Sequence, residues 1–208
     1  MIIISHRGIW KNVEDKNTKK SLKNSFEKGF GTETDLRDFN GELTISHDPP
    51  LNINSIVKNF KNIYNPEDSL VLALNIKSDG IQDLLFNFLS KNKIKNYFVF
   101  DMSIPDTIGY LDRKMRIFSR QSEYELNPSF YDLCEGIWLD CFNKIWYNED
   151  LVLNHLKNGK KVAIVSAELH KRCHNKHWQI LRKWKCINNN NLILCTDFPV
   201  EAKLYFKK

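Results

Sequence analysis

The chain has 208 residues, 42% of them hydrophobic and 12% aromatic, and its formal net charge is +6. This much apolar and aromatic material excludes an intrinsically disordered chain and suffices for a sizeable core. No apolar run approaches the roughly 18 residues of a membrane-spanning helix, so we expect no transmembrane segment and a single domain over residues 1–208.

The remaining bulk features also exclude several classes of protein. The opening run MIIIS is too short for a secretory signal, so we expect a cytoplasmic protein. The lysines are scattered without a basic stripe, and no nucleic-acid-binding module is recognisable, so we expect no nucleic-acid partner. Five cysteines without a CxxC pair indicate free thiols; they are Cys134, Cys141, Cys173, Cys186 and Cys195.

Short β-rich apolar runs alternate with helix-like segments along the chain. We expect strands at residues 2–5, 32–37, 42–46, 70–77, 97–102, 116–120, 136–141, 161–167 and 192–197. We expect helices at residues 16–28, 54–62, 80–92, 105–113, 148–158 and 175–186, with a final short one at 201–208. The turn residues Asn40-Gly41 predict a hairpin between the second strand and the short strand 42–46.

Eight of these strands lie near a following helix, which predicts a parallel sheet covered on both faces. Eight is also the number that closes a (β/α)8 TIM barrel. We therefore predict a compact α/β barrel with a small β-hairpin insertion after the second strand. An open doubly wound sheet is the alternative.

Charged residues gather in residues 31–50, where the pattern otherwise predicts a buried strand. Side chains alternate along a strand, so Glu33, Asp35 and Arg37 share one face. In a barrel, late strand positions on the lumen face lie near the catalytic mouth. Because buried unpaired carboxylates are costly, a cation between Glu33 and Asp35 is expected. Oxygen ligands favour Mg²⁺ or Ca²⁺ over zinc.

Other strand ends carry groups that suit the same mouth. His6 and Arg7 end the first strand, and His47 ends the hairpin strand. Asn75 and Lys77 share a face at the end of the next strand. Two histidines can divide general acid and general base work, while the two cationic side chains can clamp a phosphate.

Several motifs follow one another at these strand ends: HRG (6–8), KNT (16–18), GTETDLRD (31–38), ISHD (45–48), LALNIK (72–77) and, near the end, CTDFP (195–199). In this combination the chain resembles the glycerophosphodiester phosphodiesterase family, which uses a (β/α)8 barrel. The resemblance covers residues 1–80 and rests beyond them on the last motif alone.

The resemblance implies a role for each matched residue. His6 and His47 would be the catalytic acid–base pair, and Glu33 and Asp35 would bind one divalent cation, Mg²⁺ or Ca²⁺. Arg7 would contact the substrate phosphate with Lys77 beside it.

Two further positions are less clear-cut. Asn75 stands where the family usually has a third, acidic ligand, and its amide oxygen can ligate without adding charge. Asp79 is an alternative ligand that we do not favour, and Asn17 would support the mouth.

The expected activity is metal-dependent hydrolysis of a small-molecule glycerophosphodiester to glycerol phosphate and an alcohol. A link to surface polysaccharide or lipid metabolism is suggested by similarity to a short branch of the family. A catalytically silent barrel that binds a phosphorylated sugar or lipid headgroup is the alternative. The run HKRCHNKH (170–177) contains zinc-capable side chains in a spacing that matches no standard zinc finger. The sequence does not indicate an oligomeric state.

Overall fold

The computed structural model describes residues 1–54 and 56–207. The strands are β1 (Ile2–His6), β2 (Gly31–Phe39), β3 (Glu42–Ile45), β4 (Leu72–Ile76), β5 (Tyr97–Phe100), β6 (Phe118–Gln121), β7 (Gly136–Leu139), β8 (Lys161–Val165) and β9 (Leu192–Thr196). The α-helices are α1 (Lys19–Glu27), α2 (Gln82–Lys91), α3 (Ile104–Asp112), α4 (Glu149–Lys157), α5 (His174–Leu181) and α6 (Pro199–Phe206). Short 3₁₀ helices are η1 (Val13–Asp15), η2 (Phe60–Asn62), η3 (Pro66–Asp68), η4 (Ala167–His170) and η5 (Lys185–Asn188).

The chain divides into two compact units. The N-terminal unit is Ser5–Ile117, and the C-terminal unit combines Met1–Ile4 with Phe118–Lys208. Strand β1 therefore contributes its first residues to one unit and its last residues to the other. Our expectation of a single domain stays a prediction.

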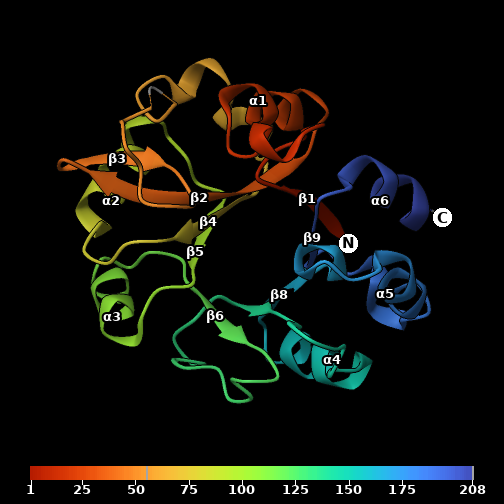
Figure 1. The fold of residues 1–208 in the computed structure, drawn as a ribbon. Coiled ribbons are helices and arrows are strands. Elements are labelled where there is room, and N and C mark those ends of the chain that lie inside the picture. Colours follow the sequence, from red (N-terminus) through yellow and green to blue (C-terminus); the bar gives the residue numbers. More distant parts are fainter. Residues whose placement is uncertain (55, 208) are drawn as a thin grey trace. The chain divides into compact units, whose positions relative to one another are not determined.

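In the N-terminal unit the strands lie in the order β5-β4-β2-β1, and β2, β4 and β5 pair in parallel. Figure 1 shows these strands side by side, with α2 and α3 on the same side of them. All five residues of β4, Leu-Ala-Leu-Asn-Ile, are buried. A strand that is buried along its whole length and apolar at four of its five positions is typical of a parallel sheet covered on both faces. The parallel register places Asp35 of β2 opposite Asn75 of β4.

The predicted hairpin is present and extends β2 beyond its parallel neighbours. Strand β3 pairs antiparallel with the last residues of β2, from Leu36↔Ile45 to Phe39↔Glu42. The two turn residues, Asn40 and Gly41, have φ angles of 50° and 76°. A two-residue hairpin turn of this hand requires positive φ at both positions, which Asn and Gly tolerate best.

In the C-terminal unit the strands lie in the order β1-β9-β8-β7-β6, with β6 to β9 paired in parallel. Each of β7 and β9 is buried along its whole length. All five cysteines are free, as predicted, and only Cys173 is exposed. Within residues 1–54 and 56–207, no helix has the length and apolar character needed to cross a membrane.

Most predicted elements agree with the structure to within a few residues, and one differs. The helix predicted over 54–62 is wrong for most of its length, since only Phe60–Asn62 form a 3₁₀ turn. Part of that prediction, residue 55, lies outside the described residues, as does residue 208 of the final helix. The side chain of Asn54 instead donates to the carbonyl of Ile45 at 2.6 Å, and this bond ties the segment to the end of β3.

Candidate active site

The predicted site residues all belong to the N-terminal unit. His6 ends β1, Glu33 and Asp35 lie on β2, and Asn75 lies on β4. The other three, Arg7, His47 and Lys77, occupy the residues just after β1, β3 and β4. The carboxyl ends of neighbouring parallel strands thus supply most of the group.

Three oxygen atoms are buried in this group without a hydrogen-bond partner. They are Oε2 of Glu33, Oδ1 of Asp35 and Oδ1 of Asn75. Glu33 and Asp35 are only 1% and 0% exposed. An unsatisfied buried carboxylate oxygen costs folding free energy. Such a cluster therefore indicates a ligand-binding site rather than a purely structural one.

Two cationic side chains lie against Asp35. Arg7 Nε is 2.7 Å from Asp35 Oδ2, although its N–H is not aligned for a hydrogen bond, so the contact is an ion pair. Lys77 Nζ is 3.6 Å from Asp35 Oδ1 and 3.8 Å from Oδ2 of Asp101. Both cations remain partly accessible, with 18% and 21% of their side chains exposed. They can therefore reach an anion that enters from solvent.

Burial is the main cause of an unusual pKa at Glu33. Burial and then the Asp35 charge raise the pKa of Glu33 to about 8, against the lowering effects of Arg7, Lys77 and a hydrogen bond with Asn75. His6 Nε2 lies 3.8 Å from Glu33 Oε2. The two neighbouring cations therefore do not fully compensate the paired carboxylates, and additional positive charge would favour their ionised form.

The backbone after β1 explains why HRG forms a fixed turn. Arg7 and Gly8 have φ angles of 61° and 87°, a conformation that glycine adopts readily. A Cβ on Gly8 would lie 2.4 Å from the carbonyl carbon of Ser21. The amide of Gly8 donates to Thr32 Oγ1 at 3.0 Å. The turn thus packs directly on α1 and β2 and directs Arg7 to Asp35.

The segment that carries His47 bonds to the same edge of β2 as the residue that follows β1. The amide of Arg7 donates to the carbonyl of Glu33 at 2.9 Å, and the amide of Ser46 donates to that of Asp35 at 3.1 Å. Carbonyls two residues apart point to the same edge of a strand, about 7 Å apart. The segments that carry the two histidines are therefore neighbours along β2.

The imidazole of His47 is exposed at the rim of the group. Its Nδ1 lies 2.9 Å from Oδ1 of Asp48, and Arg37 Nε donates to the His47 carbonyl at 2.9 Å. The ring thus contacts its neighbour Asp48 rather than the buried carboxylates. A histidine oriented through Nδ1 by a carboxylate leaves Nε2 available for proton transfer.

Two more residues contact the predicted group, and one of them, Asp101, was not predicted. Asn17, expected as a support, donates from Nδ2 to Asp35 Oδ2 at 2.7 Å and accepts from Thr34 Oγ1 at 2.8 Å. Asp101, at the end of β5, was missed because the run YFVFDM predicts only core. Its φ of 68° is unusual for a residue that continues a strand. The sequence signal for Asp101 was its position at a strand end.

The oxygen donors at β2 and β4 fit a hard divalent cation. Two carboxylates and one amide form an oxygen-only set of the kind that Mg²⁺ and Ca²⁺ prefer. Each of the three side chains carries a buried oxygen atom without a hydrogen-bond partner. No group of three or more His, Cys, Asp or Glu side chains suited to a metal occurs in the described part of the chain. A metal at this site would therefore depend on Asn75 as well as the two carboxylates.

The zinc-capable run 170–177 does not converge on one point. His170 Nε2 lies 2.6 Å from Asp140 Oδ1, His174 Nε2 lies 3.3 Å from Glu201, and His177 Nε2 pairs with the Tyr147 hydroxyl at 3.0 Å. These imidazoles have separate partners within the C-terminal unit. The structure therefore does not support a zinc site there.

Comparisons with known proteins were made by sequence and by structure. No protein-family model matches the chain, and no curated protein matches it by sequence. Solved structures do match it. A candidate glycerophosphodiester phosphodiesterase from Galdieria sulphuraria has a TM-score of 0.73 at 15% identity, covering 100% of this chain and 98% of that one. The glycerophosphodiester phosphodiesterase from Agrobacterium tumefaciens has a TM-score of 0.70 at 11% identity, covering 99% and 98%.

A third structure carries a bound product. It is a phosphodiesterase from Oleispira antarctica in complex with sn-glycerol-3-phosphate, with a TM-score of 0.68 at 14% identity, covering 100% and 97%. The chain has the fold of the glycerophosphodiester phosphodiesterases. The predicted (β/α)8 barrel is thereby confirmed, and the resemblance seen in the motifs extends to the fold. In such barrels, active sites are built at the carboxyl ends of the strands, where the group around Asp35 lies.

Proposed function

We propose that the chain is a metal-dependent phosphodiesterase that hydrolyses a glycerophosphodiester to glycerol phosphate and an alcohol. The observation that carries this proposal is the set of buried oxygens without hydrogen-bond partners on Glu33, Asp35 and Asn75, beside two accessible cations. The fold neighbours support it, since they are phosphodiesterases and one holds sn-glycerol-3-phosphate.

Arg7 and Lys77 would bind the phosphate of the substrate. A phosphodiester is anionic and repels nucleophiles, and its transition state concentrates charge on the phosphoryl oxygens. The Arg7 guanidinium can donate two parallel hydrogen bonds to such oxygens, whereas Lys77 acts as a point charge. The ion pairs that both make with Asp35 position them before substrate arrives.

Glu33, Asp35 and Asn75 would hold Mg²⁺ or Ca²⁺. When bound, that cation supplies Lewis-acid stabilisation of the phosphoryl charge. It would also satisfy the three buried oxygens and favour the ionised form of Glu33, whose pKa burial raises.

His6 and His47 would move the protons. One imidazole takes the proton from the attacking hydroxyl, which belongs to water or to the neighbouring alcohol of the substrate itself. The other imidazole protonates the leaving alkoxide. Both histidines come from segments bonded to the same edge of β2, His6 beside Glu33 and His47 beside Asp48.

The first test is turnover of glycerophosphocholine by the His6→Ala and His47→Ala variants. Each is expected to fold normally and to lose about 10²- to 10⁴-fold in kcat, the usual share of a positioned acid–base group. Released glycerol phosphate measures turnover, and circular dichroism measures folding. His174→Ala, on α5 beside Glu201, is the control. Near wild-type turnover in either of the first two variants contradicts the assignment.

A silent barrel that binds a phosphorylated sugar or lipid headgroup is the second candidate. The neutral side chain at Asn75 and the exposure of His47 favour it. Incubation of the wild-type chain with glycerophosphocholine, with Mg²⁺, Ca²⁺ or EDTA, separates the two functions. EDTA-sensitive release of glycerol phosphate supports the enzyme, whereas tight binding of the diester without release supports the silent barrel.

A further inference from the structure

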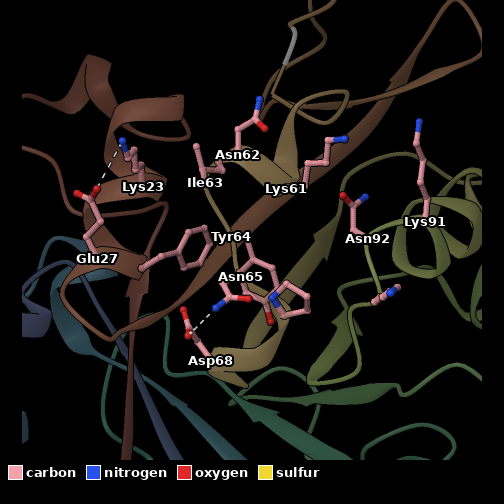
Figure 2. Close-up of a pocket in the computed structure, with 13 residues that line it drawn as sticks. Lys23, Glu27, Lys61, Asn62, Ile63, Tyr64, Asn65, Asp68, Lys91 and Asn92 are labelled. Atoms are coloured by element: carbon pink, nitrogen blue, oxygen red, sulfur yellow. Dashed lines mark hydrogen bonds and ion pairs between the residues drawn. The ribbon is translucent and has the colours of Figure 1, made fainter.

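A cavity of about 580 Å³ lies in the N-terminal unit at the amino ends of its strands (Figure 2). Its walls come from the end of α1, from residues 61–68 before β4, and from residues 91–93 before β5. Asp35 lies four residues beyond the start of β2, which is about 13 Å along a strand. The cavity is therefore remote from the candidate active site.

Lysines dominate the charge of this cavity. Lys23 pairs with Glu27 at 3.5 Å. By contrast, Lys61, Lys91 and Lys93 have no carboxylate within ion-pair distance in residues 1–54 and 56–207. Figure 2 shows Lys61 and Lys91 on one side of the cavity and the Lys23–Glu27 pair on the other.

Lys91 lies in the last turn of α2, where a cation interacts favourably with the helix dipole, but no carboxylate in the described part of the chain neutralises the charge that the three lysines share. Like charges around one hollow repel each other, and the amino end of a (β/α)8 barrel ordinarily contributes stability rather than catalysis. A bound anion would convert this repulsion into charge-assisted hydrogen bonds. The floor of the cavity is apolar, since Phe26 and Tyr64 are only 6% and 3% exposed.

A second cavity, of about 550 Å³, adjoins the first and shares Pro66 and Lys93 with it. Its walls include Leu89, Tyr97 and Phe86, and the Phe86 side chain is 48% exposed. A large exposed aromatic side chain in a hollow is a common contact for a planar or apolar ligand group. Lys93 thus lines both the first cavity, which is rich in lysines, and the second, which contains aromatic side chains.

We propose that the two cavities together bind an organic phosphate. Its anionic end lies among Lys61, Lys91 and Lys93, and its planar or apolar end lies against Phe86. A free nucleotide and a lipid headgroup phosphate share this chemistry. The proposal is independent of the activity at Asp35, because none of these side chains belongs to that group.

The test is direct binding by the full chain at moderate ionic strength, with three probes. They are ADP, inorganic tripolyphosphate, and phosphatidylcholine vesicles containing phosphatidic acid. We expect saturable binding of ADP or of the vesicles. A Lys61→Gln, Lys91→Gln, Lys93→Gln triple variant is expected to weaken it about tenfold or more, since charged hydrogen bonds are lost.

Two further variants sharpen this test. Phe86→Ala is expected to weaken binding of the organic phosphate and to leave tripolyphosphate binding unchanged. A charge-matched triple variant (Lys157→Gln, Lys176→Gln, Lys183→Gln) changes exposed lysines that line neither cavity and is expected to bind like the wild type.

Binding of ADP indicates that the phosphate belongs to a free nucleotide. Binding of the vesicles alone indicates that it belongs to a lipid headgroup. The proposal is overturned if neither ADP nor the vesicles bind saturably, if the control triple variant loses as much affinity as the test triple variant, or if Phe86→Ala leaves binding of the organic phosphate unchanged. Turnover of glycerophosphocholine by the lysine variants is expected to stay at the wild-type level, so failure here is distinguishable from failure of the proposed activity.

Discussion

Asn75 is the residue of the proposed metal site at which one substitution tests ligation most directly. Its Oδ1 is buried, lacks a hydrogen-bond partner and sits in register with Asp35. Asn75→Asp keeps the size of the side chain and adds a third anionic oxygen ligand. We expect the apparent affinity for Mg²⁺ or Ca²⁺ to rise about tenfold, because the ligands of hard cations are tuned by charge.

The measurement for Asn75 is thermal melting over a metal titration, which needs no substrate. In EDTA, the Asn75→Asp variant is expected to melt at a lower temperature than the wild type, because three buried carboxylates repel each other. Asn75→Ala removes the oxygen and is expected to lose most of the metal-induced stabilisation. Identical metal responses in all three proteins would contradict ligation by this residue.

The individual site residues differ in how readily the sequence reveals them. Glu33 and Asp35 are predictable because acidic residues in a buried strand need a partner, whatever the fold. Asp101 is not, because its meaning depends on Lys77, which approaches it only after β4 and β5 pair. The position of Asp101 at a strand end is visible in the sequence, but its contact with Lys77 is not, because a contact between two strands has no local signal.

At the scale of elements, Gly8 fixes the turn that joins β1 to α1. Gly8→Ala would place Cβ 2.4 Å from the Ser21 carbonyl carbon, at a φ of 87°. Because backbone strain and steric overlap add, we expect the free energy of unfolding to fall by about 3 kcal/mol or more. Urea denaturation at neutral pH measures this change.

Gly29 provides the matched control for that substitution. Its φ is 75°, but a Cβ there has no neighbour within 4 Å. Gly29→Ala is therefore expected to cost only the conformational strain, about 1 kcal/mol. Equal losses in the two variants would show that packing against α1 does not constrain the turn.

The elements themselves were predictable where local chemistry decides them. Asn40-Gly41 specifies the hairpin turn, and the Thr18 side chain caps α1 by accepting from the Ser21 amide. The predicted helix over 54–62 failed because the Asn54 side chain bonds back to the end of β3. Such a tertiary bond overrides weak helical preference, since asparagine competes for backbone hydrogen bonds.

At the scale of the whole molecule, the barrel was predictable from the number and alternation of strands, and the solved neighbours share its fold. Functional residues in the C-terminal unit were not predictable from the sequence. Its polar groups, such as Asp140 with His170 and Glu168 with Thr196, pair with each other, and no motif separates such pairs from a substrate site.

Acid stability is a property of the whole molecule, and we expect two buried histidines of the C-terminal unit to contribute to it. Burial, and then the Arg172 charge, lower the pKa of His177 from 6.5 to about 4, and burial also lowers the pKa of His155. Between pH 6.5 and 4 the unfolded chain therefore binds protons that the folded chain does not. The contribution of these two histidines to the free energy of unfolding is at its full value above pH 6.5 and falls as the pH decreases through this window, whereas the raised pKa of Glu33 acts in the opposite direction between pH 8 and 4.5.

For His177 alone this loss amounts to about 3 kcal/mol at pH 4, since one pKa unit corresponds to about 1.4 kcal/mol. Urea denaturation at several pH values measures the slope. His177→Gln removes the titrating group, so its slope between pH 6.5 and 4 is expected to be shallower than that of the wild type. His174→Gln, a change on the same helix at a side chain paired with Glu201, controls for the effect of glutamine on α5. The expected change follows because His177, held neutral beside the Tyr147 hydroxyl, must take up a proton when the chain unfolds at acidic pH. An unchanged slope in His177→Gln would therefore mean that the acid sensitivity arises from other residues.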